Sequence, residues 1–305
     1  MTTMTPDDRD PATREADRTE QHPDRDAAAF GDDVDVQLRV PYGRVGGRTL
    51  MLDLFTPRRM PDRPRPAIVF LHGGSWKAGS PSQFHFHAAH LATHYDMFAV
   101  SVDYRLSGEA PFPAALHDAN CAVRWVRSRC DEQRIDPTRI AVCGGSAGAH
   151  LASMMLVAPH APEYQGDGGH DDHSSAVNLG ILFNGEFDMW DLVERGSLIG
   201  PMRQFIGATP EQAPDRYTEL SAVRRVHAAV PPVLLLHGTA DLCVSHEQSI
   251  VFADRLRALG VHAEVELYEG KPHAWFNREP DRTTTLQRME RFLVEHFALG
   301  KADDA

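Results

Sequence analysis

The sequence predicts an α/β protein built on an eight-stranded, mostly parallel sheet that is flanked by helices. Two observations carry this prediction: short apolar runs recur along the chain, and the later runs alternate with helix-like stretches. Continuous apolar blocks are typical of parallel strands that helices cover on both faces. The candidate strands are Val34–Val40, Thr49–Phe55, Ala67–Leu71, Met97–Asp103, Arg139–Cys143, Asn178–Phe183, Pro232–Leu236 and Ala263–Tyr268.

The first two candidate strands differ from the later ones because polar and apolar residues alternate in them. The segment Pro41–Gly47 joins them, which predicts an antiparallel hairpin at one edge of the sheet. The helix-like stretches have residues typical of helix ends, such as Pro113 at a start and Gly260 after an end. These stretches are roughly Ser82–Tyr95, Pro113–Arg129, Ala147–Val157, His246–Leu259 and Asp281–Phe297.

The composition bounds the classes of protein. Of the 305 residues 42% are hydrophobic, which is ample for a sizeable core. Acidic residues outnumber basic ones by 43 to 31, which argues against nucleic acid or an anionic membrane as a partner. Much of this acidity lies near the amino terminus, so we predict a disordered tail over 1–30, one folded domain over 31–300 and a short tail over 301–305.

The four cysteines are too few for a disulfide scaffold, and the amino terminus lacks the apolar core of a secretory signal. No apolar run reaches the about 18 residues that a membrane span needs. These features predict a cytoplasmic protein.

One motif predicts a nucleophile. The strand that ends at Cys143 runs directly into Gly144–Gly148 (GGSAG), and a helix pattern follows. This is a G-x-S-x-G motif in the strand–turn–helix setting that presents a serine hydroxyl at a sharp turn. We therefore predict that Ser146 is the nucleophile of an acyl-transfer site.

Two other strand ends supply partners for this serine. Asp241 follows the seventh candidate strand, and His273 follows the eighth. A serine nucleophile needs a base, and the base needs a carboxylate that orients it. The chain order Ser146, Asp241, His273 is the order in which sheets with this motif carry the three groups. We predict His273 as the base and Asp241 as the acid, with Glu186 and Asp188 as fallback acids.

The third candidate strand leads into His72–Trp76 (HGGSW). Backbone N–H groups aimed at the developing oxyanion can contribute roughly 3–4 kcal/mol each, and glycines let the backbone approach closely. We predict that Gly73, Gly74 and Ala147 form this oxyanion hole. Further contacts with the substrate are expected from three residues beside these motifs: Trp76, Gly145 and Trp275.

These motifs resemble the bacterial carboxylesterase group of the α/β-hydrolase superfamily, which is related to hormone-sensitive lipase and to feruloyl and acetylxylan esterases. The resemblance spans roughly residues 35–298. It is carried by HGGSW at 72–76, DYRL at 103–106, FPAA at 112–115 with Asp118, GGSAGAHLA at 144–152 and HGTAD at 237–241. It implies an α/β-hydrolase fold, a Ser–His–Asp triad, no cofactor, and esters of short acyl groups as substrates.

The resemblance also implies structural roles for Tyr104, Arg105 and Asp118. There is one departure from the group: Asn184–Asp188 (NGEFD), after the sixth strand, replaces the turn that the relatives carry. Contacts of the pocket near this turn are therefore expected to differ.

Residues 189–224 form the only sizeable insertion, and we predict that they make a small cap. A short cap favours short-chain acyl esters, among them acetyl or feruloyl esters of carbohydrates, over long-chain lipids. An arylformamidase-type amide hydrolase uses the same parts and is the main alternative. A catalytically retired ligand-binding scaffold is a second alternative, which would normally show a broken triad. The expected partner is a small-molecule ester, and the sequence leaves a homodimer open.

Histidine clusters raise the question of a metal. Four histidines crowd the stretch Ser82–Tyr95: His85, His87, His90 and His94. His90 and His94 have the i, i+4 spacing of a metal-binding pair, but no third ligand accompanies them in a recognisable frame. We therefore expect these histidines to form a solvated face of the helix. His170–His173 (HDDH) lies in a glycine-rich stretch and is expected to be a mobile surface loop. We predict no metal site, and we expect His150 to pack beneath the nucleophile.

Overall fold

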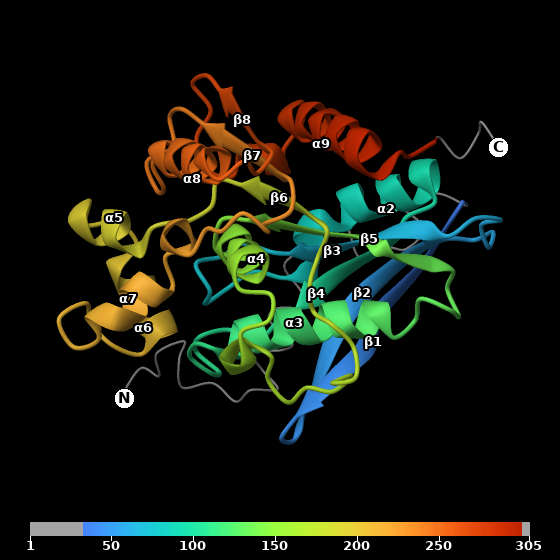
Figure 1. Ribbon diagram of the computed structural model, residues 1–305, viewed down its shortest axis with the longest axis horizontal. Helices are drawn as coiled ribbons and strands as arrows, with labels where there is room; N and C mark the ends of the chain where they lie inside the picture. Colours follow the sequence, from blue (N-terminus) through green and yellow to red (C-terminus); the bar gives the residue numbers. More distant parts are fainter. Residues whose placement is uncertain (1–32, 301–305) are drawn as a thin grey trace, which may run out of the picture.

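The computed structural model describes residues 33–300, so the tails predicted at 1–30 and 301–305 lie outside the described residues. Eight strands form one sheet in the order β1-β2-β4-β3-β5-β6-β7-β8 (Figure 1). β1 and β4 each pair antiparallel with β2, and all other pairs are parallel. The predicted sheet is therefore confirmed. The strands are β1 (Val34–Val45), β2 (Arg48–Pro57), β3 (Arg65–Leu71), β4 (Phe98–Asp103), β5 (Ile135–Gly145), β6 (Leu179–Phe183), β7 (Val233–Gly238) and β8 (Ala263–Tyr268).

The edge hairpin is longer than the sequence predicts. β1 continues through Pro41 to Val45 and β2 begins at Arg48, so only Gly46 and Gly47 form the turn. The prediction of a connecting loop from Pro41 onward is wrong. β1 is one of the two edge strands, and its pairing with β2 has two register shifts. A proline that would interrupt a central strand is tolerated at such a bulged edge.

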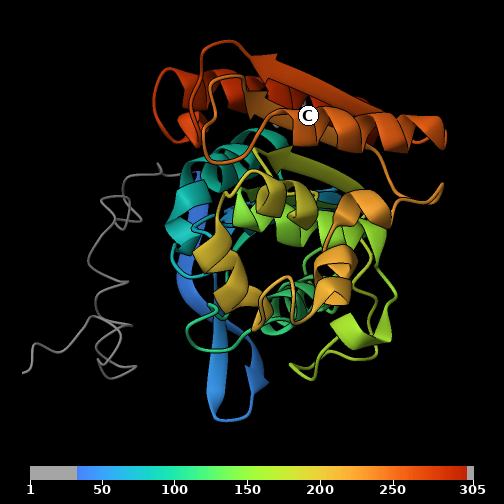
Figure 2. The ribbon, with the colours of Figure 1, turned by 90° about the vertical axis from the view of Figure 1, so that its left-hand side faces the viewer.

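Helices cover both faces of the sheet (Figures 1 and 2). Val69 and Leu71 of β3 pack into one apolar core together with α3, α4 and α8. Ile68 and Phe70 point the other way, into a second core with α2 and α9. This alternation follows from the strand period of two residues. The helices are η3 (Pro81–Phe84), α2 (His85–Tyr95), α3 (Ala114–Arg127), α4 (Ala147–Val157), η4 (Pro162–Tyr164), α5 (Met189–Glu194), α6 (Ile199–Ile206), α7 (Pro214–Glu219), η5 (Ala222–Arg224), α8 (Glu247–Ala258), η6 (Trp275–Asn277) and α9 (Asp281–Phe297).

Residues 189–224 contain α5, α6, α7 and η5, which lie together at the left of Figure 1. This segment contacts both the predicted oxyanion segment and the helix after the nucleophile: Phe205 of α6 stacks on Trp76, and the carbonyl of Leu220 bonds to His150 of α4. The role of the segment as a substrate cap stays a prediction. Within residues 33–300, no helix has both the length and the apolar character needed to cross a membrane.

Candidate active site

Ser146 stands between β5 and α4 in a strained turn. Its φ of 52° and ψ of −124° lie outside the regions that residues other than glycine usually adopt. The close packing of this turn requires glycine at position 148, because a Cβ atom there would lie 2.0 Å from the carbonyl oxygen of Leu71. α4 is thereby held against the end of β3. The serine hydroxyl is fixed at the carboxyl edge of the sheet, where ligands of such folds bind.

The side chains of Ser146, His273 and Asp241 form one hydrogen-bonded series. His273 Nε2 lies 3.0 Å from Ser146 Oγ, and His273 Nδ1 lies 2.6 Å from Asp241 Oδ2. Asp241 is fixed further by the backbone N–H groups of Cys243 and Val244, which donate to Oδ1 at 2.8 and 2.9 Å. The structure therefore brings together the three residues that the sequence assigns to three separate strand ends.

The electrostatics of this series favour a charged carboxylate beside a basic imidazole. Burial alone raises the pKa of Asp241, but hydrogen bonds from His237 and His273, with the charge of His273, hold that pKa well below its usual value. Burial alone lowers the pKa of His273, but the hydrogen bond and charge of Asp241, with the charge of Glu186, raise it above its usual value. Such an arrangement stabilises the imidazolium that forms when a base takes a serine proton.

The predicted oxyanion donors lie next to the serine but are not equivalent. A Cβ atom on Gly73 would lie 3.3 Å from Ser146 Cβ, so this backbone passes very close to the nucleophile. The N–H of Gly73 donates to Oε1 of Gln83 at 2.6 Å, a contact that sequence reasoning did not find. The N–H groups of Gly74 and Ala147 donate no hydrogen bond within the described part of the chain.

The three residues predicted to contact the substrate are all buried. Trp76 is fully buried, and its indole N–H donates to Nδ1 of His150 at 3.1 Å. Gly145 leaves room for Phe276, whose ring would lie 2.7 Å from a Cβ atom at this position. Trp275 is only 5% exposed. Direct contact of these residues with a substrate stays a prediction.

The turn after β6 places two further polar residues at the site. Glu186 is fully buried, and its Oε1 accepts a hydrogen bond from Ser146 Oγ at 3.0 Å. The amide nitrogen of Asn184 lies 3.3–3.4 Å from both ring nitrogens of His273. The other fallback acid, Asp188, instead caps α5 and pairs with Arg224. The sequence singled out this turn as a departure from the relatives and Glu186 as a fallback acid, but no local pattern indicated these contacts.

The residues that were expected to have structural roles make buried contacts near the site. Tyr104 is buried and donates its hydroxyl hydrogen to the carbonyl of His72 at 2.7 Å. Arg105 forms a two-pronged ion pair with the fully buried Asp118. His150 is fully buried and bonds to Trp76 and to the backbone of the 189–224 segment, and its packing beneath the nucleophile stays a prediction.

The histidine-rich helix α2 differs from the expectation of a solvated face. His85 bonds to Asp53 and His87 is fully buried among aromatic rings, because this side of α2 packs onto the sheet. His90 bonds to Glu290 of α9. His170 is tied down as well, since its Nε2 bonds to the carbonyl of Tyr42 at 3.0 Å.

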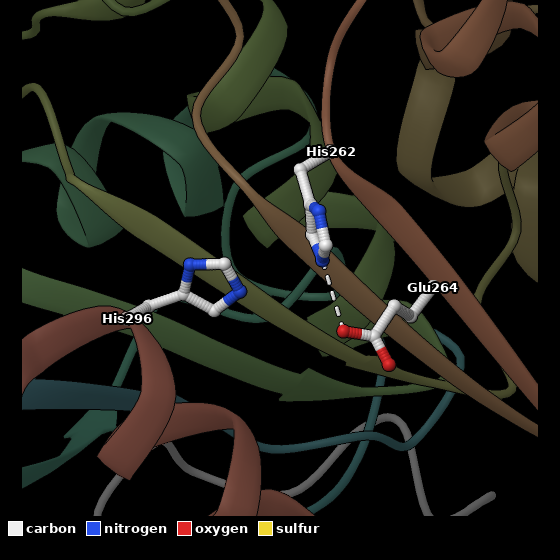
Figure 3. A group of neighbouring side chains, drawn as sticks. All are labelled: His262, Glu264 and His296. Atoms are coloured by element: carbon white, nitrogen blue, oxygen red, sulfur yellow. Dashed lines mark hydrogen bonds and ion pairs between the residues drawn. The ribbon is translucent and has the colours of Figure 1, made fainter.

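One group of three side chains in the described chain could hold a metal ion: His262, Glu264 and His296, whose ligand atoms lie within 4.8 Å of one another (Figure 3). Glu264 already pairs with His262 and with Arg288. The group lies at the start of β8, whereas His273 follows the end of that strand. A metal bound there would therefore stand apart from the serine.

The sheet order, the helices on both faces and the serine at a strand–helix elbow define an α/β-hydrolase fold. The BD-FAE family model matches residues 52–256, and the dienelactone hydrolase family model matches residues 217–297. The chain belongs to the BD-FAE family. This agrees with the resemblance to carboxylesterases that its motifs predict.

Individual relatives are esterases. The chain is 30% identical over 224 residues to esterase LipC of Mycobacterium tuberculosis. The matched region covers 72% of this chain and 55% of that protein. The chain is 29% identical over 267 residues to a probable isoprenylcysteine alpha-carbonyl methylesterase of Arabidopsis thaliana, which covers 83% and 56%. The chain thus spans little more than half the length of these curated relatives.

Solved structures match over nearly their whole length. Apo esterase 2 of Thermogutta terrifontis has a TM-score of 0.73 at 32% identity, covering 88% of this chain and 96% of that one. Its propionate-bound form has a TM-score of 0.71 at 31% identity, covering 86% and 94%.

Proposed function

We propose that this chain is a serine carboxylesterase that hydrolyses short-chain acyl esters through an acyl-enzyme. The observation that supports this best is the hydrogen-bonded series of Ser146, His273 and Asp241 at the elbow between β5 and α4. In this mechanism His273 takes the proton of Ser146 as Oγ attacks the acyl carbon, and Asp241 holds the imidazole in the required tautomer. Water then attacks the acyl-enzyme with His273 again as the base.

The oxyanion of each tetrahedral intermediate is assigned to backbone N–H groups. The N–H groups of Gly74 and Ala147 donate to no acceptor among the described residues, so they can bind a substrate oxygen. The N–H of Gly73 already donates to Oε1 of Gln83. The carbonyl oxygen of a substrate therefore displaces Oε1 of Gln83 when it takes up the third donor. Each such donor contributes roughly 3–4 kcal/mol to the transition state.

Short acyl groups are the favoured substrate class. Structures of Thermogutta terrifontis esterase 2 have been solved with propionate and with butyrate bound. The small size of the segment 189–224 supports the same preference for this chain. The four cysteines are free thiols, which supports a cytoplasmic location as part of the proposal.

The direct test combines turnover with labelling of the serine. Purified protein is assayed with the acetate, butyrate and octanoate esters of p-nitrophenol, with N-formylkynurenine and acetylated xylan alongside. We expect the two short esters to be the best substrates, and diethyl p-nitrophenyl phosphate to modify Ser146 as seen by peptide mass spectrometry. Ser146→Ala should lose turnover by several orders of magnitude. Ser153→Ala, a buried serine of the same helix, is the matched control and should retain activity. Full activity of Ser146→Ala would refute the proposal.

A further inference from the structure

Glu186 is a buried carboxyl group in direct contact with the nucleophile. It follows β6, its side chain is fully buried, and Oε1 lies 3.0 Å from Ser146 Oγ. Oε2 has no hydrogen-bond partner within residues 33–300. The proposed mechanism of the Ser146–His273–Asp241 triad does not use this carboxyl group.

One hydroxyl hydrogen on Ser146 cannot serve both neighbours. Ser146 Oγ lies 3.0 Å from Glu186 Oε1 and 3.0 Å from His273 Nε2, yet a serine donates only one hydrogen bond. Nucleophilic attack requires that this hydrogen face His273. The contact with Glu186 then needs a donor on the glutamate side, and a protonated carboxyl group supplies it. The series becomes continuous, with Glu186 donating to Ser146, Ser146 to His273, and His273 to Asp241.

The surroundings of Glu186 favour this protonated form. An ionised carboxylate without a partner for one oxygen is costly in a dry interior, whereas a neutral acid leaves only a carbonyl oxygen unpaired. Burial raises the pKa of Glu186 to about 7, although the charge of His273 and the hydrogen bond from Ser146 lower it. Asp241 is the other charged group that faces it, and Cys243 is a further titratable neighbour.

We infer that protonated Glu186 is a catalytic residue of deacylation, which holds a hydrogen bond on Ser146 Oγ as this atom leaves the acyl group. The inference rests on the proposed esterase function. Water attacks the acyl carbon and its proton passes to His273. The bond from carbon to Oγ then breaks, the electron pair goes to Oγ, and the imidazolium returns its proton to that oxygen. Glu186 keeps its own proton throughout and disperses the charge that develops on Oγ.

This role has a signature in the dependence on pH. Acylation removes the hydroxyl hydrogen of Ser146, which is one of the causes that hold the pKa of Glu186 down. The pKa of Glu186 is therefore higher in the acyl-enzyme than in the free enzyme. At more alkaline pH the carboxylate faces Oγ with a lone pair and repels the developing alkoxide. Deacylation should rise with pH as His273 becomes neutral and fall again as Glu186 ionises. Acylation should fall at the lower pKa that Glu186 has in the free enzyme, because the carboxylate then takes the hydroxyl hydrogen of Ser146 away from His273.

The experiment separates the two steps by stopped-flow kinetics with p-nitrophenyl butyrate, in which the burst reports acylation and the steady phase reports deacylation. Glu186→Leu should slow deacylation by about 10-fold or more while acylation is retained, so that a burst near one equivalent of p-nitrophenol accumulates. Glu186→Gln, whose amide donates a hydrogen bond at every pH, should restore most of the deacylation rate and lose the falling alkaline limb. Asp188→Asn on the same turn is the matched control and should behave as wild type.

Equal slowing of both steps in Glu186→Leu, or an alkaline limb that persists in Glu186→Gln, would overturn the inference. Thermal unfolding of each variant shows whether the fold is intact, and the pH profile of Glu186→Gln decides the matter if the leucine variant does not fold. Failure of the wild type to turn over any p-nitrophenyl ester would instead contradict the proposed function, so the two failures are distinguishable.

Discussion

Replacing His87 by leucine is expected to make the protein more resistant to acid. His87 is fully buried in α2, and neither of its ring nitrogens has a hydrogen-bond partner among the described residues. Aromatic rings surround it: Phe70, Phe84, Phe86 and Phe183. Burial therefore lowers the pKa of His87 to about 3, and the positive charge of Arg282 acts in the same direction.

The sign of the effect on stability depends on whether His87 binds a proton more tightly in the folded or in the unfolded chain. The pKa of His87 in the folded protein lies below the ordinary value of 6.5, so the unfolded chain takes up the proton first. Stability is then complete above the unfolded value and declines as the pH falls from there toward the folded value. One pKa unit corresponds to ~1.4 kcal/mol, so at a pH of about 4.5 His87 lowers the free energy of unfolding by ~2.7 kcal/mol. Leucine does not titrate and avoids this loss.

Urea unfolding followed by tryptophan fluorescence at a pH of about 7.5 and again at about 4.5 measures the effect. The stability advantage of His87→Leu over wild type should grow by ~2.7 kcal/mol between the two conditions. His94→Leu, at an exposed position of the same helix, should follow wild type. An equal loss of stability in wild type and His87→Leu between the two pH values would show that His87 does not lower the free energy of unfolding in acid.

Three further substitutions test the site and its support. Asp241→Asn leaves the shape of the site but removes the charge that orients His273, so kcat with p-nitrophenyl butyrate should fall by roughly three to four orders of magnitude while the circular dichroism spectrum is unchanged. Gly148→Ala places a methyl group 2.0 Å from the carbonyl oxygen of Leu71, which should lower the free energy of unfolding in urea by at least ~2 kcal/mol. Asp118→Ala leaves its arginine partner unpaired, and the same assay should show a loss of about 3–5 kcal/mol. Unchanged values in these assays would contradict the corresponding contacts.

Features that depend on short stretches of the chain could be predicted from the sequence. The turn around Ser146 is encoded by a strand, two glycines and a helix that follow one another directly. Asp241 and His273 were identified because each follows an apolar strand, and parallel strands bring their carboxyl ends to one edge of the sheet. The number of strands, the order in which the motifs follow them along the chain, and the family resemblance all rest on such local patterns.

Contacts between distant segments needed the tertiary structure. Glu186 meets Ser146 because β6 pairs with β5 in a register that opposes Phe183 and Gly145, which no local pattern reveals. The burial of His87 was missed because α2 has no sharply polar and apolar side, so the histidines that face the sheet could not be separated from those that face outward.

The sequence by itself therefore determined the α/β fold class and the three residues that we propose as the triad, because backbone propensity and strand-end position are properties of the local chain. The packing of β6 against β5 and of α2 against the sheet decided which polar groups lose water and which of them touch. That is why the carboxyl group beside Ser146 and the buried imidazole of His87 emerged only from the tertiary structure.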